Sequence, residues 1–316
     1  MAECGRIVIT GASGFIGSHL VPALVGTGCE VRCIIEPGMK DNFAGAIMYF
    51  ADICTDQGIN AVLSGADVVV HLAARNHVLK ETSKDPLAEF RRINVEGTGN
   101  IVRASVANGA KLFMHFSSIK AMGESSADVL DEESPCMPMT HYGISKLESE
   151  EVVRSEVGRS GMRAVIVRLP MAYGPRNRGN LPRMIRWADR GLPFPLFQPD
   201  NLRSMIYVEN VVAGVLASIK KAPEGISTYI LKDKEDYSTR TVYSAICRDL
   251  GKPPRFFPVP AILVRLGGVL SENFRKVTGS FRVSSAKIEK ELGFSPLFSL
   301  EEGIARTVAW YKRSAH

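Results

Sequence analysis

The sequence predicts an α/β protein built on a doubly wound parallel sheet, followed by a smaller α/β domain. Three observations lead to this fold class. A β-branched run near the start is followed by a glycine turn and an apolar helix. Strand and helix patterns then alternate through the first half of the chain, and this alternation weakens after about residue 174. Strands separated by helices favour a parallel sheet that helices cover on both faces.

Length and composition agree with a globular protein of this kind. The 316 residues, 45% hydrophobic and 23% charged, suffice for one large domain and a smaller one. The net charge of +6 (39 basic minus 33 acidic residues) suits anionic ligands. The basic residues are spread along the chain, so we expect no nucleic-acid surface. Only Met1 to Gly5 precede the first strand pattern, which leaves no room for a secretory signal and indicates a cytoplasmic protein.

Cysteine spacing and apolar runs give two further expectations. The six cysteines form no Cys-x-x-Cys pair and no metal-ligand spacing, so we expect reduced thiols and no metal. The longest apolar patch near the end, Ala261 to Leu270, is interrupted by Arg265 and is too short to span a bilayer. We therefore expect a helix of the smaller domain there, and no membrane span.

The first element is a strand, a turn and a helix in the order that a dinucleotide requires. Ile7 to Ile9 predict a buried strand, and glycines follow at positions 11, 14 and 17 before an apolar helical pattern. Glycine lets the backbone approach a pyrophosphate, and the helix N-terminus directs free N–H groups and partial positive charge at it. The alternative is a turn whose glycines only permit tight packing.

Further strands and helices follow in alternation. Strands are predicted at 31–35, 46–50, 67–72, 111–116 and 163–168, with helical stretches at 57–64, 85–108 and 141–159. Ligands of parallel sheets bind at the carboxyl ends of the strands. Several notable residues follow these ends, namely Gly11, Asp52, Ala73, Ala74, Ser117 and Ser118.

The change in pattern near residue 174 indicates a domain boundary. Between 175 and 199 the chain carries five prolines and five arginines, and its predicted elements become shorter. We predict that residues 1–173 form the cofactor domain, with a return segment at about 204–222. Residues 174–316 would then be mainly a substrate-binding domain.

A tyrosine and a lysine lie four residues apart at the start of the predicted helix 141–159. At this spacing Tyr142 and Lys146 lie on one helix face. A tyrosine with a pKa near 10 is a poor base, but a neighbouring lysine and an oxidised nicotinamide both favour the phenolate. Lowering the pKa by about three units takes roughly 4 kcal/mol of differential stabilisation. Tyr-x-x-x-Lys alone is common on helix surfaces, so the pair indicates a catalytic site only in combination with the glycine turn and the serines that follow the fifth strand.

Two serines follow the fifth predicted strand. A hydroxyl from Ser117 or Ser118 could hydrogen-bond a substrate carbinol and hold it beside Tyr142. One serine would serve the substrate, and the other could only satisfy the strand end.

The glycine turn, the serine and the Tyr–Lys pair together resemble the extended short-chain dehydrogenase/reductase superfamily over nearly the whole chain. The resemblance implies a Rossmann-type fold and NAD as cofactor. The family's catalytic hydroxyl lies five residues before a glycine, here Gly123, so Ser118, Tyr142 and Lys146 are the implied catalytic residues. The cofactor-binding residues implied by the family's segments are Gly11, Ser13, Gly14, Phe15, Ile16, Gly17, Glu36, Asp52, Ile53, Leu72, Ala73, Ala74, Asn94, Ser117, Tyr142, Lys146 and Pro170.

The second half is similar to nucleotide-sugar enzymes in the segments 172–175, 179–181 and 201–208. Asn180 and Arg203 match positions that hold the nucleotide diphosphate, beside Ser118 and Tyr142 at the sugar. A guanidinium suits a pyrophosphate, although Arg203 could instead pair with a surface carboxylate. The resemblance implies a nucleoside-diphosphate-sugar substrate and a homodimer. Within the superfamily it is nearest to bacterial UDP-N-acetyl-sugar 4-epimerases and 4-keto-reductases of polysaccharide biosynthesis.

Two residues depart from the family pattern. The acidic residue expected at the end of the second strand is Ile35 here, with Glu36 one place later. Glu36 could still bind the ribose hydroxyls and repel a 2′-phosphate, which favours NAD over NADP, while Lys40 keeps NADP open. Met171 stands where many epimerases carry a polar residue, which indicates a less polar sugar.

The leading hypothesis is an NAD-dependent UDP-sugar 4-epimerase of the UDP-glucose or UDP-N-acetylglucosamine type, with a nucleotide-sugar 4-keto-reductase as the alternative. A 4,6-dehydratase is disfavoured because the resembling enzymes place an Asp-Glu pair where Ile119 and Lys120 stand. A hydroxysteroid-type dehydrogenase would require an apolar pocket, against which Asn180 and Arg203 count. A regulatory protein that has lost the chemistry is disfavoured by the intact catalytic residues.

Overall fold

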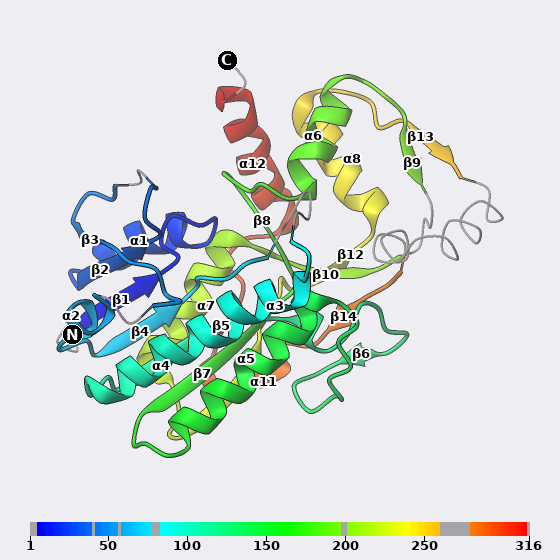
Figure 1. Ribbon diagram of the computed structural model, residues 1–316. Coiled ribbons are helices and arrows are strands. Elements are labelled where there is room, and N and C mark those ends of the chain that lie inside the picture. Colours follow the sequence, from blue (N-terminus) through cyan, green and yellow to red (C-terminus); the bar gives the residue numbers. More distant parts are fainter. Residues whose placement is uncertain are drawn as a thin grey trace.

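Seven parallel strands form the central sheet (Figure 1), in the order β11-β7-β5-β4-β1-β2-β3. The computed structural model describes residues 5–39, 42–55, 58–76, 83–196, 201–259 and 279–314. The chain winds outward in both directions from β1 and β4, so their carboxyl ends form the topological switch point of the sheet. The strands are β1 (Arg6–Thr10), β2 (Glu30–Ile35), β3 (Ala46–Phe50), β4 (Val68–His71), β5 (Leu112–Ser118), β7 (Arg163–Leu169) and β11 (Ile226–Ile230).

Helices cover both faces of this sheet. Successive residues of β1 point to opposite faces, so Ile7 and Ile9 belong to one buried cluster and Val8 to the other. The first cluster includes side chains of α1 (Gly17–Val25), α7 (Val208–Lys221) and α11 (Ala286–Leu292). The second includes α2 (Ile59–Leu63), α4 (Gly97–Ala107) and α5 (His141–Val157). Figure 1 shows α4 and α5 side by side across one face.

The predicted doubly wound α/β fold is confirmed, with two differences in its elements. All six predicted strands are present, but β11 adds a seventh that the sequence analysis did not predict. The single helix predicted over 85–108 consists of α3 (Pro86–Arg91), the π-turn η1 (Arg92–Glu96) and α4. Asp85 caps its start by accepting a hydrogen bond from the backbone N–H of Ala88 at 3.1 Å.

Short strands and three helices form a second, smaller body. One sheet has the order β12 (Asp236–Tyr237), β10 (Arg203–Tyr207), β8 (Met171–Tyr173). Two-stranded sheets join β13 (Phe256–Pro258) to β9 (Phe194–Leu196) and β14 (Arg282–Val283) to β6 (Val129–Leu130). Helices α6 (Asn180–Asp189), α8 (Thr239–Leu250) and α12 (Leu300–Ser314) share a third hydrophobic cluster and lie together above the sheet in Figure 1.

The predicted division of the chain at residue 173 stays a prediction. Three segments of the second half, α7, β11 and α11, belong to the large sheet or its covering layer. All of α7 falls within the return segment predicted at 204–222, whereas β10 joins the small sheet. The predicted helix at 261–270 and the lysine at position 40 lie outside the described residues.

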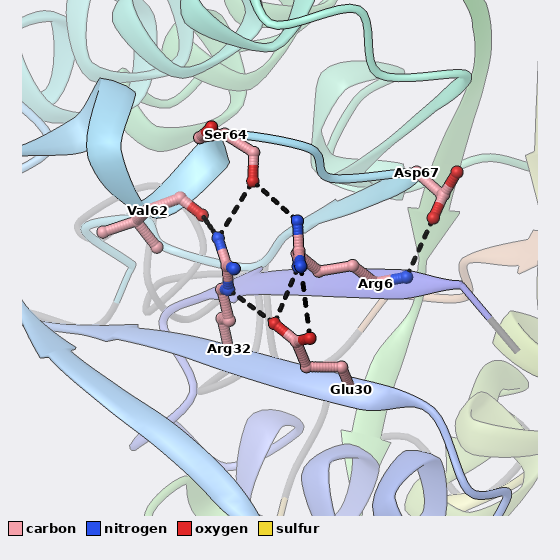
Figure 2. A network of polar contacts seen from close by, with 6 residues as sticks. All are labelled: Arg6, Glu30, Arg32, Val62, Ser64 and Asp67. Carbon is pink, nitrogen blue, oxygen red and sulfur yellow. Dashed lines mark hydrogen bonds and ion pairs between the residues drawn. The ribbon is translucent and has the colours of Figure 1, made fainter.

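A polar network closes the amino-end edge of the sheet (Figure 2). Glu30 accepts hydrogen bonds from the Nε atoms of Arg6 and Arg32 at 2.7 and 2.9 Å. Both guanidinium groups also donate to the carbonyl oxygen of Ser64 at 3.0 Å, just beyond α2. The N–H of Arg6 donates to Asp67 at 2.9 Å. These charges join β1, β2 and the end of α2 at the edge opposite the strand carboxyl ends.

The cysteines differ from expectation at one position. Cys29 is disulfide-bonded, so the prediction of reduced thiols is wrong for this residue, and its partner lies outside the described residues. Cys33, Cys54, Cys136 and Cys247 are free thiols. No group of His, Cys, Asp and Glu side chains suited to a metal ion occurs among the described residues. In the same part of the chain, no helix combines the length and apolar character needed to cross a bilayer.

Candidate active site

The glycine turn lies at the switch point, where β1 ends beside β4. Gly11 has a φ of +68°, and a Cβ atom there would lie 2.6 Å from the backbone nitrogen of Ala73. A Cβ atom on Gly17 would lie 2.4 Å from the carbonyl oxygen of Ala12. These two glycines therefore allow the turn to approach β4 and α1 to pack on the turn. Gly14, by contrast, is exposed.

The start of α1 fits an anionic ligand such as the pyrophosphate of NAD. No side chain caps this helix, and no acidic residue lies in its first turn. A helix start leaves its first N–H groups without intrahelical acceptors. The neighbouring residues Ser13, Phe15 and Ile16 are partly exposed. Free N–H groups, positive dipole and accessible backbone therefore coincide at the place predicted for the cofactor phosphates.

The residues predicted for the adenosine half lie farther along the same edge. Glu36 directly follows β2 and is exposed, and Asp52 is exposed two residues after β3. The Asp52 carboxylate accepts a hydrogen bond from the N–H of Cys54 at 2.9 Å. Ile53 is buried in the cluster that contains α4. The strand order β1-β2-β3 thus aligns these residues outward from the glycine turn.

The segment that follows β4 leaves the sheet beside the glycine turn. The N–H of Leu72 donates to the carbonyl of Thr10 at 3.2 Å, and the N–H of Ala73 donates to the Thr10 hydroxyl at 3.2 Å. Leu72, Ala73 and Ala74 are all partly exposed. They can therefore line a ligand held against the turn.

Asn94 lies within the π-turn η1 and is completely buried. Its carbonyl oxygen accepts from the N–H of Arg75 at 2.7 Å. Its amide nitrogen donates to the Arg75 carbonyl at 3.0 Å and to the Ser145 hydroxyl at 2.9 Å. Both amide hydrogens thus have protein acceptors. Asn94 ties the segment after Ala74 to α5, so its effect on a cofactor is exerted through the backbone that it positions.

Ser118, Tyr142 and Lys146 come together where β5 ends against the first turns of α5. The Ser118 hydroxyl lies near enough to the Tyr142 phenol to lower its pKa. Thr140 caps α5, because its hydroxyl accepts from the N–H of Gly143 at 3.1 Å. Lys146 lies one turn beyond Tyr142 and is only 2% exposed. The geometry therefore unites the three residues that the sequence analysis selected as catalytic.

Burial shifts the pKa values of the two ionisable groups of this trio, Tyr142 and Lys146, in opposite directions. It raises the pKa of Tyr142 to about 12, and the nearby Ser118 hydroxyl offsets part of the increase. Burial lowers the pKa of Lys146 to about 8, and the charge of Glu150 counteracts this. The pKa of Tyr142 was expected to fall because of Lys146. In this structure that lowering is absent, because loss of hydration dominates.

The side chain of Ser117 satisfies groups at the strand end, the role that the sequence analysis left open for one of the two serines. Its hydroxyl donates to the Glu150 carboxylate at 2.5 Å. Glu150 is paired with Arg168 at 2.8 Å, and both of these side chains are almost fully buried. The predicted contact of Ser117 with the cofactor stays a prediction.

Pro170 is buried between β7 and β8, next to Ser118. Ser118 pairs with Leu169 in the sheet, and its hydroxyl lies 3.4 Å from the Leu169 carbonyl oxygen. The backbone around Pro170 is therefore placed beside Ser118, as expected for a segment that meets the nicotinamide.

The predicted substrate residues come from the smaller body. Asn180 is exposed at the first position of α6, and Arg203 is half-buried at the first position of β10. The Arg203 guanidinium donates to the carbonyl of Gly279 at 3.0 Å. Burial lowers the pKa of Arg203, and the charge of Glu124 raises it. Met171, at the start of β8, is 42% exposed.

Two buried histidines support the floor of the site and were missed by the sequence analysis. The rings of His71 and His115 stack with centroids 5.7 Å apart. His71 contacts the hydroxyls of Thr10 and Thr98, and His115 contacts that of Ser149. Burial, with a smaller effect of Lys146, lowers the pKa of His71 to about 3. The sequence marks them only by position, since His71 and His115 each lie near the end of a predicted strand.

The sequence matches the family described as "NAD dependent epimerase/dehydratase family" over residues 7–230. This match covers well over half of the chain and includes the glycine turn and the catalytic trio. The chain belongs to this family. It is accordingly an NAD-dependent enzyme of the nucleotide-sugar epimerase and dehydratase group.

Similar proteins extend this relationship over nearly the full length. UDP-glucose 4-epimerase of Vibrio cholerae is 30% identical, with 95% of this chain and 94% of the relative covered. The N-acetyl-alpha-D-glucosaminyl-diphospho-ditrans,octacis-undecaprenol 4-epimerase of Escherichia coli O157:H7 is 27% identical, with 96% and 95% covered. The structure of MoeE5 in complex with UDP-glucuronic acid and NAD superposes with a TM-score of 0.83 at 25% identity, covering 98% and 100%.

Proposed function

We propose that this family member is a UDP-sugar 4-epimerase of the UDP-glucose or UDP-N-acetylglucosamine type. The observation that carries the proposal is the union of Ser118, Tyr142 and Lys146 beside the uncapped start of α1. Similarity over 95% of the chain to a UDP-glucose 4-epimerase supports the same reaction. In polysaccharide biosynthesis, such an enzyme would supply the second C4 epimer of a sugar precursor.

Tyr142 is the group that would take the proton of the sugar C4 hydroxyl. The Ser118 hydroxyl, which lies near Tyr142, would orient that sugar oxygen. Bound NAD supplies a hydride acceptor that can return the hydride to either face of the resulting 4-keto sugar. Lys146 would add positive charge beside the phenol and thereby favour its ionised form. The buried Glu150 carboxylate supports that charge on Lys146.

The alternative is a nucleotide-sugar 4-keto-reductase with the same catalytic residues. A reductase consumes reduced cofactor, whereas an epimerase returns the hydride and needs no external reductant. A 4,6-dehydratase has less support, because Lys120 forms an ion pair with Glu124 where the resembling enzymes place an acidic residue. A hydroxysteroid-type dehydrogenase is also less favoured, since the exposed Asn180 and half-buried Arg203 suit a polar ligand.

The deciding experiment incubates the purified protein with UDP-glucose or UDP-N-acetylglucosamine and catalytic NAD. Proton NMR should show conversion to the corresponding 4-epimer without added NADH. The Tyr142→Phe variant provides the control for contaminating activity. Conversion only of a 4-keto sugar, with stoichiometric NADH consumption, would establish the reductase instead.

The adenosine half of the site predicts a preference for NAD over NADP. Glu36 is exposed directly after β2, where its charge would repel a 2′-phosphate on the ribose. Fluorescence titration of the cofactor-free protein should give tighter binding for NAD. The Glu36→Gln variant should narrow the difference, and equal binding of both cofactors by the unmodified protein would show that Glu36 points elsewhere.

Three expectations from the sequence accompany this proposal. Asn180 and Arg203 would hold the diphosphate of the substrate, and the protein would be a cytoplasmic homodimer. Sedimentation velocity at several protein concentrations tests the homodimer directly.

A further inference from the structure

Glu124 lies just beyond the catalytic strand end and uses its two carboxylate oxygens in different directions. It is 9% exposed and directly follows Gly123. Oε2 forms an ion pair with the Lys120 ammonium. Oε1 accepts a hydrogen bond from the Thr140 hydroxyl at 3.0 Å. One buried carboxylate therefore bridges the segment after β5 and the residue that caps α5.

The Lys120 side of this bridge leads to Ser118. Lys120 belongs to the single turn η2 (Ile119–Ala121), and its N–H donates to the Ser118 hydroxyl at 3.2 Å. The position of the Lys120 backbone therefore bears on the direction of the catalytic hydroxyl. Holding the Lys120 side chain against Glu124 restrains that backbone.

The Thr140 side of the bridge leads to Tyr142. The Thr140 hydroxyl donates to Glu124 and accepts from the N–H of Gly143, so it connects the carboxylate to the first turn of α5. That turn also rests directly on η2, since a Cβ atom on Gly143 would lie 2.3 Å from the Lys120 carbonyl oxygen. Tyr142 lies between the two connected residues, Thr140 and Gly143.

The same carboxylate faces the substrate side of the site. Burial lowers the pKa of Arg203, and the charge of Glu124 offsets part of that decrease. The Lys120 ammonium lies 5.8 Å from the ring centroid of Phe281, and the Phe281 backbone forms a bridge with Arg203. Glu124 thus interacts with two cations. Lys120 is hydrogen-bonded through its backbone to the Ser118 hydroxyl, and Arg203 is the residue predicted to hold the substrate diphosphate.

We propose that Glu124 is a positioning residue that sets the geometry between Ser118 and Tyr142 through Lys120 and Thr140. This inference rests on the proposed function, in which Ser118 orients the sugar hydroxyl and Tyr142 takes its proton. A small displacement of either group lowers the rate of proton transfer more than it lowers substrate binding. Loss of Glu124 therefore acts on kcat and leaves KM nearly unchanged.

The kinetic test compares Glu124→Gln, Lys120→Met and the double variant, with NAD and UDP-glucose as the probe substrate. We expect each single variant to lower kcat by about 10- to 100-fold with KM within about threefold. The double variant should be no worse than the more impaired single variant, because both remove the same ion pair. Lys120→Arg should restore most of the rate. Glu30→Gln, which breaks an exposed ion pair at the opposite edge of the sheet, should leave kcat unchanged.

A second measurement judges the inference without any turnover. Hydrogen exchange should be faster at the amides of Lys120 and Gly143 in Glu124→Gln, and unchanged there in Glu30→Gln. Unchanged exchange at both amides, or additive losses of kcat in the double variant, would overturn the positioning role. Inactivity of the unmodified protein on every nucleotide sugar would instead contradict the proposed function, while the exchange result would still decide the role of Glu124.

Discussion

At the scale of single residues, the site depends on how burial changes the pKa values of Lys146 and Tyr142. With a pKa of about 8, Lys146 loses its proton before Tyr142, whose pKa is about 12. Burial therefore favours a neutral phenol at Tyr142 near neutral pH. For the proposed role of Tyr142 as base, a phenolate there requires more positive charge than Lys146 alone provides. A bound oxidised nicotinamide would supply such charge beside Tyr142.

Replacing the proposed base tests this directly. Tyr142→Phe removes one oxygen from a packed ring, so binding of NAD and UDP-glucose should persist while turnover falls by about 100- to 10,000-fold. The pH profile of the unmodified protein should rise through an ionisation well below 12. Lys146→Met should move that rise to higher pH. Steady-state kinetics and calorimetric titration provide the measurements, and a phenylalanine variant that keeps most of its turnover would refute the assignment.

The buried lysine should also cost stability. Its pKa falls from 10.5 in the unfolded chain to about 8 in the fold. Below pH 8 both states are charged and the folded state carries the full cost, roughly 3 kcal/mol. Between about 8 and 10.5 the unfolded chain binds more protons, so the contribution of Lys146 to stability should become less unfavourable as pH rises.

Lys146→Met should therefore raise the free energy of unfolding at pH 7 by about 1–3 kcal/mol, measured by urea denaturation. Lys111→Met is the matched control, because that lysine forms an exposed pair with Asp67. Its removal should not stabilise the fold. If the Lys146 variant and the unmodified protein have equal free energies of unfolding between pH 7 and 10.5, burial of the Lys146 ammonium does not destabilise the fold.

Single residues also show where sequence reasoning stopped. Ser117 and Ser118 are adjacent hydroxyls, and the family resemblance selected Ser118 as catalytic without indicating which protein group Ser117 contacts. The partner of Ser117 is Glu150, 33 residues away, which only the packing of α5 on the sheet brings within reach. The trio itself could be predicted because a strand end and one helical turn place its members by local geometry.

At the scale of elements, the turn before α1 determines how closely a cofactor can approach. Gly17→Ala would place a Cβ atom 2.4 Å from the Ala12 carbonyl, and neither group can move without displacing the turn. We expect about 1–3 kcal/mol of lost stability from overpacking, together with weaker NAD binding. Gly26→Ala, at the other end of α1, is the control, because its Cβ would lie 3.4 Å from the nearest carbonyl oxygens. Calorimetric measurement of unfolding and of NAD binding for both variants decides whether the effect belongs to the turn or to the helix as a whole.

Elements also separate what periodicity could predict from what it could not. Buried β-branched runs such as Val68–His71 identify strands of a two-sided sheet without further information. Strand β11 has the mixed sequence Ile-Ser-Thr-Tyr-Ile and follows the change in pattern, so it carried no comparable signal. The π-turn between α3 and α4 lies inside a stretch that the sequence predicts as one helix, because its distinction from an α-helix lies in the backbone hydrogen bonds.

At the scale of the whole molecule, we propose that the sheet provides the cofactor half of the site and the smaller body the substrate half. Arg203→Ala should therefore weaken the binding of UDP-glucose by about 10- to 150-fold, because a charge-assisted contact worth about 1.5–3 kcal/mol is lost. The binding of NAD should stay unchanged. Arg183→Ala removes an exposed arginine from α6 and serves as the control for net charge. Calorimetric titration of each ligand separates the two effects. Equal weakening by both variants would assign the effect to charge in general.

The core beside β1 has a consequence for how the protein is made. Ile7 and Ile9 of β1 share a buried cluster with side chains of α1 and α7 and with Ile288 and Leu292 of α11. The last part of this cluster is therefore filled only when α11 has been synthesised. Chains that lack α11 expose this apolar surface to one another, which favours aggregation. Removing α11 should therefore lower the solubility of the protein even though every strand of the large sheet is kept.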